Sequence, residues 1–261
     1  MDLGLDDKHV LITGGTRGIG LACARLYLAE GARVTLCGRT AASCGVAAQQ
    51  LGAGERLIAI AADVTDPVAV AQLVDQAQGG HGPVDILVNC AGAAARRPFG
   101  ELDCAAWHAA MNAKFHAYMN VTDVVVKRMA ARRQGSIVNV IGMGGKFPTP
   151  IHLAGGAANA ALMLATAGLA AAYAPSGVRV NAVNPTLTKT ERMNEGLAAQ
   201  ARQEGITVEE ALRRSASRMP LGRIATPEEV ADVVVYLSST RASYVSGSIL
   251  NIDGASSPSV V

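Results

Sequence analysis

The stretch His9-Val10-Leu11-Ile12-Thr13-Gly14-Gly15-Thr16-Arg17-Gly18-Ile19-Gly20 decides the fold. Its first five residues predict a β-strand, and the helical pattern Ile19–Glu30 follows almost directly. Gly14, Gly18 and Gly20 lie at the junction, and a glycine-rich turn there lets backbone N–H groups approach a pyrophosphate. The stretch therefore predicts the first strand and helix of a dinucleotide-binding sheet, with a plain tight turn as the alternative.

Strand patterns alternate with helical patterns along the rest of the chain. Further strands are predicted at 33–37, 57–61, 85–89, 136–140, 178–182 and 248–252, and crossover helices at 67–78, 107–132, 157–174 and 227–238. The strands lack polar alternation, as expected when helices cover both faces of a sheet. The predicted fold is α/β: a doubly wound, seven-stranded parallel sheet (Rossmann fold) in a single domain, residues 1–261. A polar, helical insertion over the carboxyl edge of the sheet is predicted at Thr188–Pro220.

Composition excludes several other classes of protein. Half of the 261 residues are hydrophobic and 17% are charged, which excludes a disordered chain. The net charge of +2 gives no argument for a nucleic-acid or membrane partner, and the five cysteines form no C-x-x-C pair, so neither disulfides nor a metal site is expected. The acidic N-terminus lacks a signal-peptide pattern, and Ala154–Ala174 fits a buried helix better than a membrane span. We expect a cytoplasmic protein.

Further motifs follow the glycine turn in order, and with them the chain resembles the short-chain dehydrogenase/reductase family, notably its 3-oxoacyl-[acyl-carrier-protein] reductases. The motifs are Gly14-x3-Gly18-x-Gly20, Asp63-Val64, Asn89-Cys90-Ala91-Gly92 and Asn184-Pro185-Thr186-Leu187-Thr188-Lys189-Thr190. The resemblance implies hydride transfer with a small-molecule substrate, which the sequence does not name, and a homotetramer or homodimer. It also implies cofactor contacts at Gly14, Thr16, Arg17, Gly18, Ile19, Gly20, Arg39, Asp63, Val64, Asn89, Ala91, Gly92, Asn159, Pro185, Thr188 and Thr190.

The choice of cofactor follows from charge. Enzymes that use NAD usually place an acidic residue after the second strand to hold the ribose 2′-hydroxyl group. Here that stretch reads Cys37-Gly38-Arg39-Thr40, with no acid and one arginine, and Arg17 lies within the glycine turn. Two guanidinium groups suit a 2′-phosphate, which favours NADP(H) over NAD(H). The alternative is that both arginines are solvated surface charges.

Three of the four catalytic groups that the resemblance implies are absent. The family uses a tyrosine as acid, a lysine that lowers the pKa of this tyrosine, a serine that orients the carbonyl group and an asparagine in a proton relay. Asn112 matches the asparagine, but Gly142, Gly155 and Asn159 stand at the serine, tyrosine and lysine positions. Neither glycine can supply a proton, and a neutral amide cannot shift a neighbouring pKa by charge. The usual mechanism for reducing ketones is therefore not expected.

Two titratable side chains in the loop before Gly155 could replace the tyrosine: His152 and, as a second candidate, Lys146, whose alternative is a solvated loop lysine. His152 lies three residues before Gly155, and a histidine titrates near neutral pH; its alternative role is in the pocket wall or a subunit contact. Two functions stay open. The first is an NADP(H)-binding oxidoreductase of atypical mechanism, and the second is a catalytically inactive nucleotide-binding regulator or partner subunit. Lyase or hydratase chemistry is a weaker third possibility.

Overall fold

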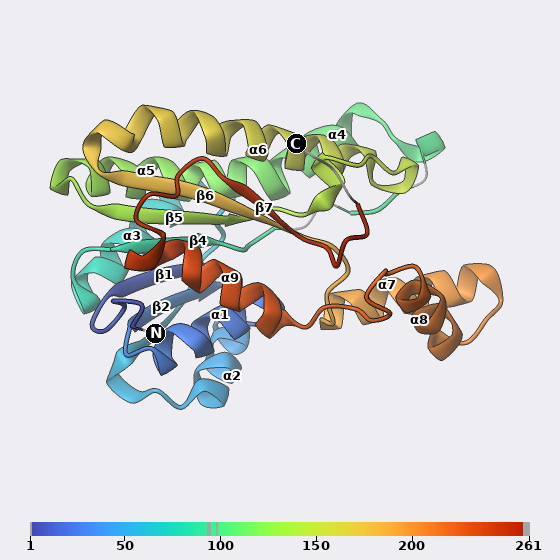
Figure 1. Ribbon diagram of the computed structural model, residues 1–261, viewed down its shortest axis with the longest axis horizontal. Coiled ribbons are helices and arrows are strands. Elements are labelled where there is room, and N and C mark those ends of the chain that lie inside the picture. Colours follow the sequence, from blue (N-terminus) through green and yellow to red (C-terminus); the bar gives the residue numbers. More distant parts are fainter. Residues whose placement is uncertain (1, 93–94, 98, 258–261) are drawn as a thin grey trace.

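A parallel sheet organises the molecule, as the computed structural model shows for residues 2–92, 95–97 and 99–257. Within this described part, seven parallel strands pair in the order β3-β2-β1-β4-β5-β6-β7, which confirms the predicted doubly wound α/β fold (Figure 1). The strands are β1 (His9–Thr13), β2 (Arg33–Gly38), β3 (Leu57–Ala61), β4 (Ile86–Asn89), β5 (Gly135–Val140), β6 (Val178–Pro185) and β7 (Ile249–Ile252). The strand order reverses direction at β1 and β4, and such a switch point is where open α/β sheets bind ligands.

Helices cover both faces of this sheet. They are α1 (Gly18–Ala29), α2 (Ala41–Leu51), α3 (Pro67–His81), α4 (Cys104–Met111), α5 (Ala117–Arg132), α6 (Leu153–Tyr173), α7 (Glu191–Glu204), α8 (Val208–Ser217) and α9 (Pro227–Ser238). One apolar core joins α1, α2 and α9 to the sheet, and another joins α3, α5 and α6 to its opposite face. With helices on both faces, β1, β4 and most of β2 and β5 are buried, which explains why they show no polar alternation.

Two helices differ from their predicted bounds. The predicted helix 107–132 is a helical segment from Cys104 to Arg132 that is interrupted by a π-helical turn, Asn112–His116. Helix α6 begins at Leu153, four residues before the predicted start at Ala157, because Gly155 and Gly156 lie inside its first turns instead of ending a loop. Both glycines are buried against the preceding loop, so tertiary packing overrides their low helix propensity.

The polar segment Thr188–Pro220 is helical, as predicted. It contains α7 and α8, which pack on each other through a small apolar core of Leu197, Ala201 and Ala211. Figure 1 shows this pair of helices beyond the end of β6, standing apart from the helices that cover the sheet. Thr190 begins α7, where its side-chain oxygen accepts a hydrogen bond from the Met193 N–H group and its methyl group lies against Gly18.

One helical segment, Pro150–Ser176, is long and apolar enough to cross a membrane by length and composition alone. Half of its most apolar window is buried inside the protein. The buried side includes Ala158, Leu162 and Met163, which face the sheet, while Leu164 is 78% exposed. The central helix of a water-soluble α/β fold meets the same criterion, so this finding is weak evidence for a membrane span.

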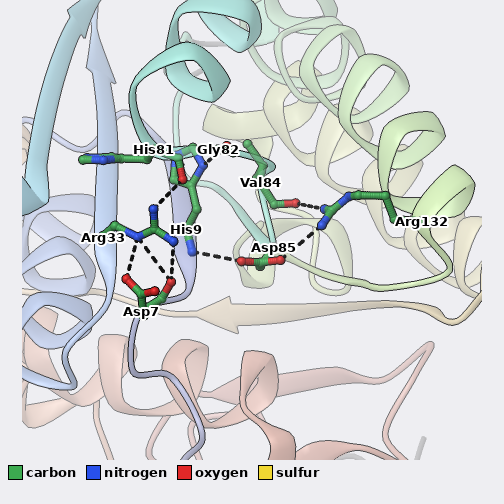
Figure 2. Close-up of polar contacts among 8 residues, drawn as sticks. All are labelled: Asp7, His9, Arg33, His81, Gly82, Val84, Asp85 and Arg132. Atoms are coloured by element: carbon green, nitrogen blue, oxygen red, sulfur yellow. Dashed lines mark hydrogen bonds and ion pairs between the residues drawn. The ribbon is translucent and has the colours of Figure 1, made fainter.

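At the opposite, amino-terminal edge of the sheet, a histidine pair is buried among charged groups (Figure 2). His9 is fully buried; its Nδ1 donates to the Gly82 carbonyl oxygen over 2.7 Å, and its Nε2 lies 2.9 Å from Thr35 Oγ1. The His81 ring packs edge-on against it, with ring centroids 5.4 Å apart. The pKa of His9 is lowered to about 4, mainly by burial and also by the nearby His81 and Arg33, against the opposing effects of Gly82 and Asp85.

This burial predicts a loss of stability in mild acid. An unfolded His9 binds a proton below its ordinary pKa of about 6.5, whereas folded His9 stays neutral down to about pH 4. Protons thus favour the unfolded chain in this window, so stability falls with falling pH, by about 3 kcal/mol for this group. We expect His9→Gln to remove that part of the pH dependence of the urea unfolding free energy. If the unfolding free energies of wild type and His9→Gln differ by the same amount at pH 7 and at pH 4.5, His9 is not the source of this pH dependence.

Candidate functional site

Close backbone contacts hold the glycine turn at the switch point. Gly14 has a φ of +66°, and a Cβ there would lie 2.8 Å from the Cα atom of Ala91 in the turn after β4. A Cβ on Gly20 would overlap the Gly14 carbonyl oxygen, so α1 also packs directly on the turn. Thr13 Oγ1 accepts hydrogen bonds from the Cys90 and Ala91 N–H groups and so ties the two turns together. Side chains at these glycines would push the two turns apart.

The amino end of α1 fits a pyrophosphate. Arg17 precedes the helix in an extended conformation, and within the described chain no side chain caps this end and no acid lies in its first turn. Its first N–H groups and the positive end of the helix dipole therefore remain available to an anion. Thr16 bridges to β2, because its methyl group lies 2.5 Å from where a Cβ of Gly38 would be. Ile19 packs against the core and orients the helix.

The two predicted 2′-phosphate ligands lie near this end, each beside an acidic residue. The Arg17 guanidinium lies 3.6 Å from the carboxylate of Glu191 on α7, and both side chains are more than half exposed. Arg39 follows β2 with an exposed side chain, close enough to Asp63 to help lower the pKa of that carboxyl group. The larger causes of that shift are the Thr65 N–H and hydroxyl groups, which donate to Asp63 Oδ1. Val64 is buried beside it, with its carbonyl oxygen bonded to Asn120.

The residues at the end of β4 and in the turn that follows have two kinds of surroundings: some are buried in the fold and others lie at the carboxyl edge of the sheet. Asn89 is fully buried, and its side-chain amide donates hydrogen bonds to Thr122 on α5 and Asn139 on β5. Its side chain therefore links these elements to β4. Ala91 and Gly92 lie at the carboxyl edge itself. Burial raises the pKa of the Cys90 thiol to about 11, so this thiol is protonated at neutral pH and does not act as a nucleophile. In the described chain no cluster of three His, Cys, Asp or Glu residues could hold a metal ion.

Gly142 and Asn159, which the sequence analysis places at the family's serine and lysine positions, lie close together. Gly142 follows β5 at a φ of +122°, a conformation that residues with side chains rarely adopt. Asn159 on α6 is 5% exposed, and its Nδ2 lies 3.5 Å from the Gly142 carbonyl oxygen. From the last residues of β6 onward, Pro185, buried Thr188 and Thr190 form the far wall of the same edge. The backbone at Gly142 is therefore adapted to a residue with no side chain.

The His152 ring lies over Gly155, where the sequence analysis expects the family's tyrosine position. It directly precedes α6, and a Cβ on Gly155, the tyrosine position, would overlap the imidazole ring. The other side of the ring is 3.1 Å from where a Cβ of Gly144 would be, and the same Gly144 position is 3.6 Å from Asn159 Nδ2. The two glycines thus form a niche for the ring within reach of Asn159. The loop that carries His152 is fixed by this packing, a constraint that the sequence alone does not reveal.

Lys114 and Tyr118 form a buried hydrogen-bonded pair near the site, which the sequence analysis missed. Asn112 begins the π-helical turn with an exposed side chain, but Lys114, two residues later, is buried. Lys114 Nζ donates to Tyr118 Oη over 2.8 Å and to the Val140 carbonyl oxygen over 3.1 Å. The spacing of four residues on a helix was the available signal. The π-helical turn that places the pair has no sequence pattern of its own.

An apolar hollow adjoins the His152 loop. It has a volume of about 460 Å³ and is lined by Phe99, Pro148, Thr149, Pro150 and Leu153. Pro150 and Leu153 lie within two residues of His152 in sequence, whereas the imidazole ring itself packs on Gly155. The Arg97 N–H group donates to the Ile151 carbonyl oxygen over 3.0 Å, which connects the segment that contains Arg97 to the loop that carries His152. The lining of the hollow is apolar and suits an apolar group.

A profile described as short chain dehydrogenase matches residues 8–201, which include all of these positions up to α7. The chain belongs to the short-chain dehydrogenase family. A curated relative of this short-chain dehydrogenase is the cis-4-hydroxycyclohexanecarboxylate dehydrogenase of Sinomonas cyclohexanicum. The two are 36% identical over 249 residues, which cover 95% of this chain and 96% of the relative.

Solved structures share the fold of this short-chain dehydrogenase over its length. L-sorbose reductase from Gluconobacter frateurii, in complex with NADPH and L-sorbose, has a TM-score of 0.94 and 30% identity, and covers 100% of both chains. A variant of actinorhodin polyketide ketoreductase with NADPH has a TM-score of 0.91 and 32% identity, over 95% of this chain and 96% of that one. The chain is thus part of an oxidoreductase family with NADPH-bound structural neighbours.

The niche of His152 predicts a coupled effect of two substitutions. Gly155→Ala adds a methyl group that overlaps the imidazole, so it should destabilise the protein or displace the ring. In a His152→Ala background the same change meets no ring, and replacing a helical glycine with alanine should stabilise the protein by about 0.5–1 kcal/mol. Urea unfolding of the four proteins measures the coupling. Equal effects of Gly155→Ala in both backgrounds would show that the ring lies elsewhere.

Proposed function

We propose that this chain is an NADP(H)-dependent oxidoreductase in which His152 replaces the family's tyrosine as the proton donor. The observation that carries the proposal is the placement of the imidazole ring over Gly155. An imidazole, which can donate a ring proton, thereby fills the space from which a tyrosine at position 155 would project. The fit of the glycine turn and the free end of α1 to a pyrophosphate supports the cofactor.

The chemistry divides between the cofactor and the chain. When bound, NADPH supplies a hydride to the carbonyl carbon of the substrate. The carbonyl oxygen then needs a proton, and a protonated His152 donates one from its ring and becomes neutral, so ketone, hydride and proton together give an alcohol. Asn159 is uncharged and hydrogen-bonds a ribose hydroxyl group instead of tuning the proton donor. The apolar hollow in the loop before α6 favours a substrate that is apolar around its reacting carbonyl group.

An iminium substrate would lessen the need for an acid. An iminium carbon accepts hydride without a proton on nitrogen, so the reaction could proceed without the tyrosine. A panel of ketones, imines and enones with NADPH therefore covers the substrate classes that this site suits.

The arginine after β2 should set the cofactor preference. Arg39 is exposed at the carboxyl end of β2, where a 2′-phosphate of NADP(H) would lie, and a charge-assisted bidentate contact contributes about 1.5–3 kcal/mol. We expect Arg39→Ala to weaken NADPH binding about tenfold or more in calorimetric titration and to leave NADH binding unchanged. Arg25→Ala, an exposed arginine on α1, is the control. Equal affinity of the wild-type protein for NADPH and NADH would contradict the preference.

Removal of the imidazole should abolish most turnover and spare cofactor binding. We expect His152→Ala to lower kcat on a ketone by about 10²–10⁴-fold while the Kd for NADPH stays the same. His108→Ala, an exposed histidine on α4, should retain wild-type kcat. A ketone turned over at the same rate by wild type and His152→Ala would exclude His152 as the donor.

The second candidate function is a nucleotide-binding regulator or partner subunit without catalysis. The favouring observation is the backbone at Gly142, whose φ of +122° is rarely adopted by residues with a side chain. The backbone at this position therefore does not favour a serine. This function predicts micromolar NADPH binding with no turnover across the whole panel. A substrate turned over at about 1 s⁻¹ or faster would reject it.

A further inference from the structure

The π-helical turn places a buried ammonium group under the carboxyl edge of the sheet. A Cβ on Gly92, in the turn after β4, would overlap the Ala113 carbonyl oxygen, so the π-helical turn is packed against the end of β4. From there Lys114 reaches the end of β5, where the Val140 carbonyl oxygen accepts hydrogen bonds from both Lys114 Nζ (3.1 Å) and Tyr118 Oη (2.5 Å). The ammonium group is thus fixed between the ends of β4 and β5.

Burial makes the charge of this group effective over a distance. Lys114 is 8% exposed and Tyr118 is fully buried, and the Lys114 ammonium group lies 4.5 Å from the centre of the Tyr118 ring. A charge held in the protein interior is screened much less than one at the surface. Its field reaches the neighbouring turn, where it opposes the rise in the pKa of the Cys90 thiol.

The nicotinamide half of the proposed cofactor must lie over the same part of the edge. Arg39 and Asp63 mark the adenosine side, over β2 and β3, and the pyrophosphate fits the end of α1 at the switch point. The other half therefore extends over β4 and β5, toward Gly92, Gly142 and His152. These are the strand ends between which the Lys114 ammonium group is fixed.

We propose that Lys114 is a positioning and specificity residue that makes the site prefer the reduced cofactor, NADPH, over NADP⁺. The oxidised nicotinamide ring carries a positive charge and the reduced ring is neutral, so a fixed cation beneath the ring penalises only the oxidised form. Tyr118 holds the ammonium group in place as its hydrogen-bond acceptor. Lys114 thereby supplies from the π-helical turn the positive charge that Asn159 lacks. The inference rests on the proposed NADP(H)-dependent function.

The test compares the affinities for the two redox forms by calorimetry, with no turnover required. We expect the wild-type protein to bind NADPH more tightly than NADP⁺, and Lys114→Met to lower the ratio Kd(NADP⁺)/Kd(NADPH) about fivefold or more. Lys127→Met is the matched control, because Lys127 is a 64% exposed lysine on α5 paired with Asp123, and it should leave the ratio unchanged.

Each outcome separates this inference from the function on which it rests. If neither nucleotide binds to the wild-type protein, the proposed function fails. If both bind and Lys114→Met leaves the ratio within twofold of wild type, the role of Lys114 is rejected and the function stands. If Lys114→Met and Lys114→Gln both fail to fold, the wild-type ratio decides, because equal affinity for NADPH and NADP⁺ contradicts a penalty on the oxidised ring. A merely structural lysine would change stability and leave the ratio untouched.

Discussion

The site depends on backbone packed directly against backbone at the carboxyl edge of the sheet. The turn after β1 touches the turn after β4 because Gly14 has no side chain, and α1 touches the first turn because Gly20 has none. The Thr13 hydroxyl group then binds two N–H groups of the second turn. These contacts bring to the switch point a helix end that no side chain of the described residues caps, so the helix dipole and the crevice coincide there.

Close packing at glycines also determines the structure around the start of α6, where the family resemblance implies catalytic side chains. Gly144 and Gly155 leave room for a ring, and His152 fills that room from the residue that precedes α6. The glycine and the histidine form one unit, since a side chain at position 155 and the ring at 152 would overlap. The absence of a tyrosine is therefore built into the packing of the loop on α6 and is not a single isolated substitution.

The sequence predicted the elements whose signals are local and missed those set by packing. The bounds of β1 and β3 and of α9 match, because apolar runs and the cap of Thr226 with Pro227 and Glu229 determine them within a few residues. The glycine turn and Arg39 are found where their motifs place them. The start of α6 and the position of His152 were not predictable, because buried loop–helix contact makes Gly155 and Gly156 helical. The burial of Lys114 was not predictable either, because it depends on a π-helical turn, and no residue spacing predicts such a turn.

The chain retains a phenol and an ammonium group near its site, but on a different helix and in a different role. The family places a tyrosine and, four residues later, a lysine on the helix after the fifth strand, whereas here Lys114 and Tyr118 have the reverse order on the preceding helical segment. Tyr118 is fully buried with its hydroxyl group directed at the Val140 carbonyl oxygen, so it does not reach a substrate. Under the proposed function the proton comes from another group, His152, whose ring packs on Gly155. In the proposed mechanism, charge and proton donor, which the family joins in one pair, are separated between the π-helical turn and the residue before α6.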